Sequence, residues 1–320
     1  MKSAIVSGSI AAGIVLACAG PAQAQYPARP IRLIVPFAAG SVNDLVARVV
    51  TVPMSEALGQ PIVIDNRAGA AGNLGAEIAA QAPPDGYTLL MGNASHTISA
   101  TLYEHLNYDF VKDFAPVSHL AAGAFLLAAH PSLPAKSVKE LIALAKSRPD
   151  ELNVGVGGAS IIMAAELFKS TAGIRMTNIA YKGTPAILTA LAGGELSVGF
   201  PPTSAAVPMV RAGKVRALGV TGKRRSTMAP DIPTVAEAGL PGYEAATWYA
   251  LMARAGTPRR IVTRLNAEAV RALERPDVRK RFAATDLAPA SSTSQELGKY
   301  VRGEVAKWSK VVKASGLRAN

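Results

Sequence analysis

The stretch I-R-L-I-V-P-F-A-A-G-S, which runs from Ile31 to Ser41, carries the clearest sign of the fold. Its apolar, β-branched part from Ile31 to Phe37 predicts a strand, and the small residues from Ala38 to Ser41 predict a tight turn that leads into a helix. Units of this kind build sheets in which crossover helices join parallel strands. The stretch therefore favours an α/β fold, provided that the unit recurs.

The unit does recur, because apolar runs alternate with segments of helical pattern through most of the chain. The predicted strands are Ile31 to Phe37, Pro61 to Asp65, Tyr87 to Gly92, Phe125 to His130, Leu152 to Val156, Leu196 to Phe200 and Val215 to Val220. The predicted fold class is thus α/β, with parallel strands.

Residues typical of helix starts mark several predicted helices. They are Ser137 with Glu140 and Thr293 with Glu296, which have capping-box spacing, and Thr184-Pro185, which pairs an N-cap with a first-turn proline. Gly193 is expected to stop the helix that Thr184 begins. Pro53 is expected to kink or end the first helix after about three turns, because proline lacks an N–H group. Trp308 recurs with apolar residues at helical spacing, which predicts a place in the core.

The N-terminus has the order of a secretory signal: Lys2, then an apolar run from Ala11 to Cys18, then Ala22-Gln23-Ala24. We expect cleavage near Ala24 and a periplasmic mature protein. Lipoprotein processing at Cys18 is a minor alternative. No later segment reaches the ~20 apolar residues of a spanning helix, so stable membrane insertion is not expected.

Composition narrows the class of the mature protein. The single cysteine lies in the leader, so disulfides and thiolate metal sites are not expected. The 296 residues that follow the leader (320 minus 24) suggest two domains. The formal charge of +12 falls to +11 without Lys2, yet the basic residues are scattered and aromatics make up only 5%. Nucleic acid is therefore not an expected partner, whereas a field that favours anionic solutes is.

No repeat and no low-complexity linker marks a domain boundary, so the pattern of predicted elements has to locate it. The chain is expected to cross between domains near Gly123 and Trp248. The predicted parts are a signal peptide over residues 1–24, a first lobe of 25–123 plus 248–320, and a second lobe of 124–247. A ligand cleft would lie between the two lobes.

The chain carries no strong catalytic, cofactor or metal motif. The elbow G-x-S-x-G is absent from the mature chain, and no Gly-Lys pair is followed by Ser or Thr as a P-loop requires. Gly155-Val156-Gly157 is a weak dinucleotide fingerprint, because Ser160 occupies the position of its third small residue. The four histidines show no metal-ligand spacing. His96 is the one that could face a cleft, although a satisfied loop histidine explains it as well.

Small-residue turns between strands and helices are the better binding signal. They are Ala38 to Ser41, Gly155 to Ser160 and Lys182 to Thr184. Such turns bring backbone N–H groups and the positive end of a helix dipole to one point, which favours an anion. Two or three that converge would bind a carboxylate, whereas any single turn could equally serve tight packing.

Motifs along the whole mature chain support a family resemblance. They are Tyr26 to Ile31, Pro36 to Arg48, Val63 to Gly75, Asp85 to Leu90, Asp113 to Val117, Ala165 to Lys169, Tyr181 to Ala186, Ala212 to Thr221 and Pro233 to Gly242. In these motifs the chain resembles the Bug receptors, which are periplasmic solute-binding proteins of tripartite tricarboxylate transporters.

The resemblance implies two α/β lobes that close on a small organic acid without a cofactor, and a membrane permease as partner. It also implies ligand-binding positions on both sides of the cleft. These are Phe37, Ala39, Gly40, Ser41, Asn43, Asn93, Ser95, His96, Gly157, Gly158, Ala159, Ser160, Tyr181, Thr184, Pro202 and Thr203.

Three positions depart from the family pattern: Ser41 replaces a glycine, Ile162 a frequent histidine and Pro201 a common aspartate. Loss of an imidazole and a carboxylate would make one pocket wall more apolar. We therefore hypothesise a ligand with one anchored carboxylate and an uncharged or aromatic portion.

The sequence thus predicts a solute-binding receptor that is not an enzyme. One alternative is a ligand-loaded partner of a membrane signalling protein. A weaker alternative is an exported hydrolase that uses His96 or Ser160.

Overall fold

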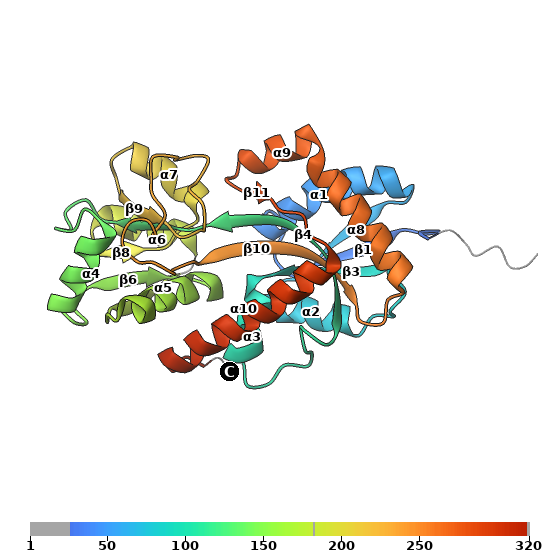
Figure 1. Cartoon of the computed structure of the whole chain (residues 1–320), viewed down its shortest axis with the longest axis horizontal. Coiled ribbons are helices and arrows are strands. Elements are labelled where there is room, and N and C mark those ends of the chain that lie inside the picture. Colours follow the sequence, from blue (N-terminus) through green and yellow to red (C-terminus); the bar gives the residue numbers. More distant parts are fainter. Residues whose placement is uncertain (1–25, 182, 319–320) are drawn as a thin grey trace, which may run out of the picture.

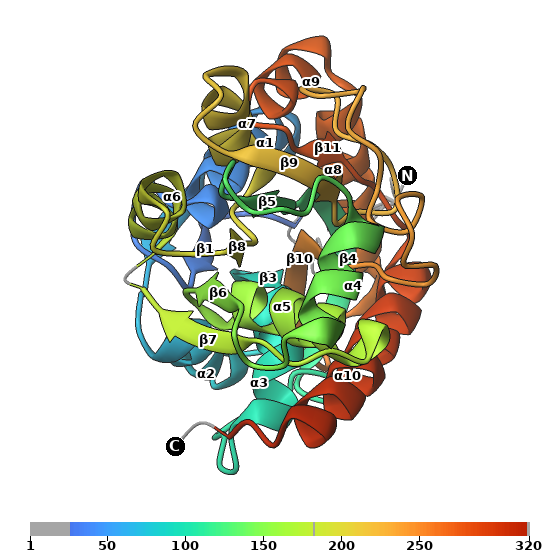
Figure 2. The same cartoon turned by 90° about the vertical axis from the view of Figure 1, so that its left-hand side faces the viewer.

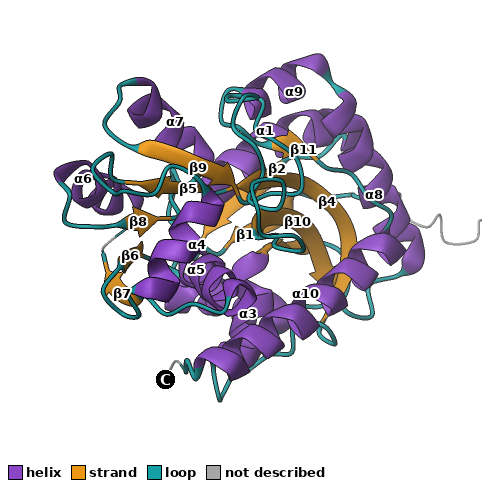
Figure 3. Cartoon of the chain, turned by 60° about the vertical axis from the view of Figure 1, so that its left-hand side comes forward, coloured by secondary structure: helices purple, strands orange, loops and turns teal. Residues whose placement is uncertain are grey.

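The computed structural model describes residues 26–181 and 183–318, so the predicted signal peptide and its alternative lie outside the described residues. The described chain forms two sheets, each flanked by helices, in two lobes (Figure 1). Strands lie inside and helices cover them on the outside (Figure 3). This bilobed α/β architecture confirms the predicted fold class.

The first lobe is built on a sheet with the strand order β11-β4-β10-β3-β1-β2. Its strands are β1 (Ile31–Val35), β2 (Ile62–Asn66), β3 (Thr88–Asn93), β4 (Phe114–Ala124), β10 (Ala246–Arg254) and β11 (Ala288–Pro289). The helices around it are α1 (Val42–Leu58), the 3₁₀ turn η1 (Ala70–Gly72), α2 (Asn73–Ala80), α3 (Ala94–Leu102), α8 (Arg259–Glu274), α9 (Pro276–Ala283) and α10 (Ser294–Ser315). β1 pairs in parallel with β2 and β3, whereas β10 is antiparallel to both β3 and β4.

The second lobe is built on a sheet with the order β7-β6-β8-β5-β9. Its strands are β5 (Leu126–Ala129), β6 (Asn153–Val156), β7 (Thr177–Ala180), β8 (Val198–Gly199) and β9 (Arg216–Val220). Its helices are α4 (Val138–Ser147), α5 (Ala159–Ala172), α6 (Thr184–Gly193) and α7 (Thr203–Arg211). β6 is parallel to β7 and β8, and β5 is antiparallel to β8 and β9.

Each predicted strand overlaps an observed one, but the expectation of parallel strands alone is wrong. β4 and β10, the long antiparallel pair, were not predicted, and neither were β7 and β11. β4 contains Pro116 and Gly123, which are weak strand formers, and its irregular register with β10 blurs the alternation of buried side chains. Both sheets are therefore mixed.

The helix signals are mostly accurate. Thr293 and Glu296 form a reciprocal capping box, whereas Glu140 accepts from the Lys136 N–H group at 2.8 Å instead of from the Ser137 N–H. α6 begins at Thr184 with Gly183 as its N-cap, one residue earlier than predicted, and left-handed Gly194 follows its last residue. α1 does not end at Pro53 but continues to Leu58.

Two chain crossings and one helix join the lobes. The chain passes from β4 to β5 around Phe125 and returns into β10 at Ala246. α10 extends from the first lobe to α5 of the second (Figures 1 and 2), and its Trp308 is buried in the apolar cluster of the second lobe. The buried Glu304 carboxylate accepts from Nε1 of Trp248 at 3.3 Å and of Trp308 at 3.0 Å, which ties α10 to β10. Trp308 therefore has the predicted core position, while the domain limits drawn from the sequence stay a prediction.

Candidate ligand-binding site

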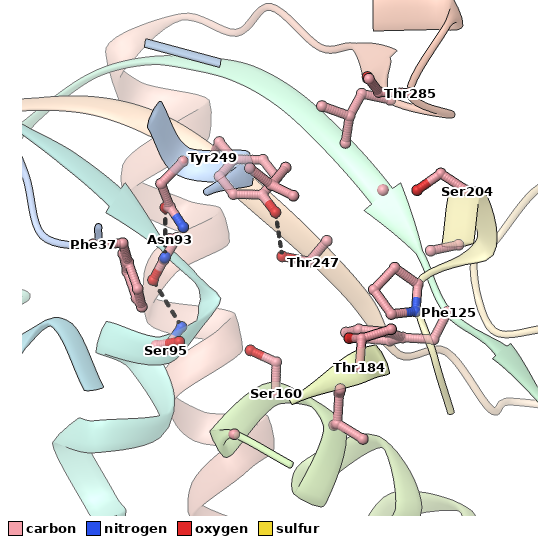
Figure 4. A pocket seen from close by; sticks show the side chains of 18 of the residues that line it. Phe37, Asn93, Ser95, Phe125, Ser160, Thr184, Ser204, Thr247, Tyr249 and Thr285 are labelled. Atoms are coloured by element: carbon pink, nitrogen blue, oxygen red, sulfur yellow. Dashed lines mark hydrogen bonds between the residues drawn. The ribbon is translucent and has the colours of Figure 1, made fainter. Parts of the chain in front are cut away.

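A pocket of about 460 Å³ lies between the two lobes and takes its lining from both (Figure 4). Its size is typical of sites for small organic ligands. The sequence-predicted residues that line it are Phe37, Asn43, Asn93, Ser95, Gly157, Gly158, Ala159, Ser160, Thr184 and Pro202. Their contact with a ligand stays a prediction at this point.

Five described helices start at this pocket, because α1, α3, α5, α6 and α7 each contribute lining residues from their first turn. The strands that precede α1, α3 and α5 are β1, β3 and β6, so these turns stand at the carboxyl ends of strands. Ligands of open α/β sheets bind at this edge. Of the three small-residue turns predicted to converge, the two that end at Ser160 and Thr184 contribute lining residues, whereas the turn from Ala38 to Ser41 does not.

At the two helix starts from the first lobe, the N-cap side chain accepts a hydrogen bond from a backbone N–H group of the first turn. The Ser41 hydroxyl accepts from the Asp44 N–H group at 3.3 Å. The Asn93 carboxamide oxygen accepts from the Ser95 N–H at 3.0 Å, and its Nδ2 donates to Asn43 at 2.7 Å. These contacts satisfy N–H groups that a helix start leaves without intrahelical partners.

The three helix starts from the second lobe have no side-chain cap. α5, α6 and α7 follow Gly158, Gly183 and Pro202, and none of these residues offers a side-chain acceptor. Gly158 has a φ of 83°, which a side chain would strain, and a Cβ on Gly157 would lie 2.9 Å from the Tyr181 carbonyl oxygen. The backbone can therefore turn tightly and leave N–H groups of the first helical turn open to an anion.

Hydroxyl groups surround these open helix starts. Ser160, Thr184 and Ser204 line the pocket, and no hydrogen bond of their hydroxyls to another described residue is present. From the crossing strand β10, the Thr247 hydroxyl donates to the Tyr249 hydroxyl at 3.4 Å. Burial raises the pKa of Tyr249 to about 12, so its O–H group remains protonated and available as a donor near neutral pH.

The rest of the lining is largely apolar. Its apolar members include Phe37, Val42, Phe125, Ile161 and Leu287. Asp286 is the single Asp or Glu among the lining residues that the structure describes, and no Lys, Arg or His is among them. The pocket therefore combines an anion-favouring end with an apolar body.

The predicted residues Ala39, Gly40 and Ser41 do not line the pocket. Their turn is exposed in part and holds the start of α1, because the Gly40 N–H donates to the Asp44 carboxylate at 2.9 Å. Ser41 thus serves as the N-cap of α1.

His96 also lies outside the pocket lining, which removes the cleft-facing role considered for it. It is fully buried and stacks on Phe110 with ring centroids 5.0 Å apart. Its Nδ1 accepts from the Asn93 N–H at 3.1 Å, and burial lowers the pKa of His96 to about 4. The ring is therefore neutral near pH 7 and completes the cap of α3.

Tyr181 and Thr203 have structural contacts close to the pocket. The Tyr181 backbone bonds to Val156 at 2.8 Å and shapes the turn around Gly157. The buried Thr203 hydroxyl donates to the Ala124 carbonyl at 3.0 Å, next to the crossing between lobes.

The expectation that Ile162 and Pro201 form an apolar pocket wall is wrong. Ile162 packs against the core of the second lobe, and Pro201 is buried with its carbonyl bonded to the Leu126 N–H at 2.8 Å. The side chains one position away, Ile161 and Pro202, line the pocket instead. The apolar character survives, but its source is different.

Several lining residues were missed, among them Phe125, Thr247, Tyr249 and the segment 285–287. They come from the crossing strands and from the loop between α9 and β11, which carry no small-residue turn motif. Thr247 and Tyr249 reach the pocket through the antiparallel pairing of β10 with β4, for which the sequence carries no short motif.

No described helix is long and apolar enough to cross a membrane. Within 26–181 and 183–318, no group of three or more His, Cys, Asp or Glu side chains has the geometry to hold a metal ion.

The fold and the pocket together define a two-lobed solute-binding receptor. Residues 46–317 match the profile of the family described as "Tripartite tricarboxylate transporter family receptor". The chain belongs to this family. It is 35% identical to protein BugT of Bordetella pertussis over 314 residues, which cover 96% of each chain.

Two similar solved structures carry ligands. One is R. palustris Rpa4515 with adipate, at 37% identity and a TM-score of 0.78, covering 92% of this chain and 99% of that one. The other is MatC (Rpa3494) from Rhodopseudomonas palustris with bound malate, at 36% identity and a TM-score of 0.75, covering 90% and 100%. The predicted family is confirmed.

Proposed function

We propose that this protein captures a small carboxylate-bearing organic molecule between its lobes and delivers it to a membrane transporter of the tripartite tricarboxylate type. The observation that carries the proposal is the set of three uncapped helix starts, α5, α6 and α7, which face the pocket from one side. Their N–H groups favour a carboxylate without any basic side chain. The adipate and malate bound to the two similar structures support the same ligand chemistry.

We assign the ligand contacts to residues that line the pocket from both lobes. The N–H groups and hydroxyls around Gly158, Ser160 and Thr184 would hold the carboxylate, while Asn43 and Tyr249 are donors from the other lobe. Phe37 would cover the body of the ligand. The remaining sequence-predicted residues would act by holding these groups in position.

Closure of the lobes would complete the site, since the pocket takes its lining from both. A ligand that contacts both lobes binds the closed form more tightly and so shifts the equilibrium towards it. The closed form would then dock on the permease. We further propose export to the periplasm with cleavage near Ala24, and no enzymatic activity.

Calorimetric titration with organic acids and with the primary amides of the same acids tests the ligand class. We expect binding of at least one acid and at least ~30-fold weaker binding of its amide, because the amide lacks the charge that the helix starts favour. Equal affinity for acid and amide would contradict the proposal. Recovery of the ligand chemically unchanged separates a receptor from a hydrolase.

The partner is tested by capture from membranes with the ligand-loaded protein. Enrichment of a permease supports the transport role, whereas enrichment of a signalling protein alone supports the sensor alternative. Small-angle scattering with and without ligand tests closure, and an unchanged radius of gyration would contradict it.

A further inference from the structure

We propose that the pocket selects carboxylates whose opposite end carries a hydrogen-bond donor, above all an ammonium group, and that Asp286 recognises this end. The inference rests on the proposed carboxylate anchor at α5, α6 and α7. It makes the expected ligand different in kind from adipate and malate, which carry carboxylates at both ends.

The first observation is the position of Asp286 in the pocket. It follows Thr285 in the loop between α9 and β11, and both residues line the cavity. Figure 4 shows Thr285 across the pocket from Ser160, which begins the proposed anchor. A ligand held at Ser160 by one end would therefore extend towards the loop that carries Asp286.

The second observation is that the Asp286 carboxylate can accept further hydrogen bonds. Its Oδ1 accepts from the Ser226 hydroxyl at 2.7 Å and from the Thr227 hydroxyl at 3.4 Å. Its Oδ2 accepts from no described residue, and no described basic side chain forms an ion pair with it. An ionised carboxylate accepts several hydrogen bonds, so Oδ2 is open to a donor from the ligand.

The third observation is that the loop holds Asp286 in place. Asp286 has a φ of 55°, and its N–H bonds to the Ala283 carbonyl at 3.2 Å. The next residue, Leu287, is buried and bonds through its N–H to Phe282 at 3.0 Å. Because Ser226 belongs to the second lobe, the Asp286 side chain is also fixed from across the cleft. The loop contacts order the Asp286 backbone whether or not the lobes are closed, which lowers the cost of ordering the carboxylate when a ligand binds.

Charge gives this arrangement its selectivity. A second carboxylate at the far end of a ligand would face Asp286 with no described basic side chain in the lining to offset the repulsion. An ammonium group there would form a charge-assisted hydrogen bond instead. We expect the difference between the two to reach at least roughly tenfold in affinity.

The test uses acids of matched length that differ only at the far end. The probes are the unsubstituted acid, the diacid and the ω-amino acid at four, six and eight carbons, for example hexanoate, adipate and 6-aminohexanoate. The full mature chain is titrated by calorimetry at pH 7. At the length that binds best, we expect the ω-amino acid to bind at least roughly tenfold more tightly than the diacid.

Asp286→Asn is the decisive variant, and Glu151→Gln is the matched control because it removes the same charge at an exposed position outside the pocket lining. We expect D286N to weaken the ω-amino acid about tenfold and to strengthen the diacid several-fold, while E151Q changes neither. Thermal unfolding of both variants checks that they fold.

The outcomes separate the two proposals. A tighter diacid in the wild type, or a preference unchanged in D286N, overturns the role of Asp286 but leaves the carboxylate receptor intact. If no probe of any length binds, the receptor proposal fails, and the inference fails with it.

Discussion

The two walls of the pocket begin their helices in different ways. In the first lobe, Ser41 and Asn93 cap α1 and α3 with their own side chains. In the second lobe, α5, α6 and α7 begin after residues that supply no side-chain cap. Both walls have strand–turn–helix units, yet side-chain caps satisfy a first-turn N–H group at each helix start of the first wall and at none of the second. The comparison teaches that the anion preference of such a pocket depends on what stands at the N-cap.

The largest effect is expected when a helix start of the second lobe is given an acidic side chain of its own. Ser160→Asp puts a carboxylate into the first turn of α5, where it would repel the ligand carboxylate and compete for the same N–H groups. We expect affinity for the best acid to fall about a thousandfold, from a repulsion of about 4 kcal/mol.

The same substitution should not destabilise the fold, since an acidic side chain at a helix N-terminus is favourable by about 0.5 kcal/mol. Calorimetry and thermal unfolding measure the two effects separately. Ser160→Asn is the uncharged control and should keep binding within a few-fold. Tight acid binding by S160D would show that the carboxylate is anchored elsewhere.

Lowering the pH should destabilise the protein through His96, which completes the cap of α3 in the first lobe. The folded pKa of His96 is lowered to about 4 from 6.5 because burial disfavours the charged ring. The unfolded chain therefore binds a proton first as pH falls, so stability present above pH 6.5 is lost progressively down to pH 4, by roughly 3 kcal/mol. Unfolding free energies measured at several pH values between 7 and 4 test this.

Burial also lowers the pKa of the half-buried His119, which adds a similar pH dependence, so the variant His96→Gln isolates the contribution of His96. In H96Q, we expect the pH dependence of the unfolding free energy to correspond to the uptake of about one proton fewer on unfolding. An unchanged slope would mean that His96 does not titrate in this range.

Removing the N-cap side chain of α3 in the first lobe should lower the stability of the fold. Asn93→Ala removes the cap of α3 and the 2.7 Å hydrogen bond to Asn43, and we expect a loss of about 1–2 kcal/mol in the free energy of unfolding. Asn93→Asp retains the cap acceptor and should recover part of the loss. Chemical denaturation provides the measurement, and a variant as stable as wild type would show that the cap contributes nothing.

The smallest effect is expected at the exposed turn before α1. Ser41→Ala removes a 3.3 Å capping hydrogen bond outside the pocket lining. We expect a loss of about 0.5–1 kcal/mol in stability with ligand affinity unchanged. A large loss of affinity in S41A would favour the direct ligand contact that the family resemblance implied for this residue.

The sequence predicted the parts of this pocket that have a local cause. A strand, a turn of small residues and a helix follow one another at Ile31 to Ser41 and around Gly157, and hydrogen bonding within each unit is enough to form it. Tyr249 reaches the pocket on a strand whose pairing joins residues more than 100 positions apart, such as Tyr249 with Ala121, and Phe125 lies between β4 and β5. No local pattern encodes that pairing.

Burial explains the remaining differences. His96 follows a strand in a polar loop, which is typical of a cleft residue, but its ring stacks on Phe110 and caps the backbone instead. Asp286 had no motif around it, because its position depends on how α9 and β11 pack over β4. Local signals therefore located two of the three uncapped helix starts, at Gly158 and Gly183, and tertiary packing determined the rest of the lining.

The most direct test of the account is the response of individual backbone amides when an acid binds. In ¹⁵N-labelled protein titrated with the best-binding acid, we expect the largest amide shifts at Ser160, Ile161 and other first-turn residues of α5, α6 and α7. The amides of Asp44 and Ser95, which are already bonded to their caps, should move little. Large shifts at Asp44 and Ser95 with the second-lobe amides unmoved would contradict the account.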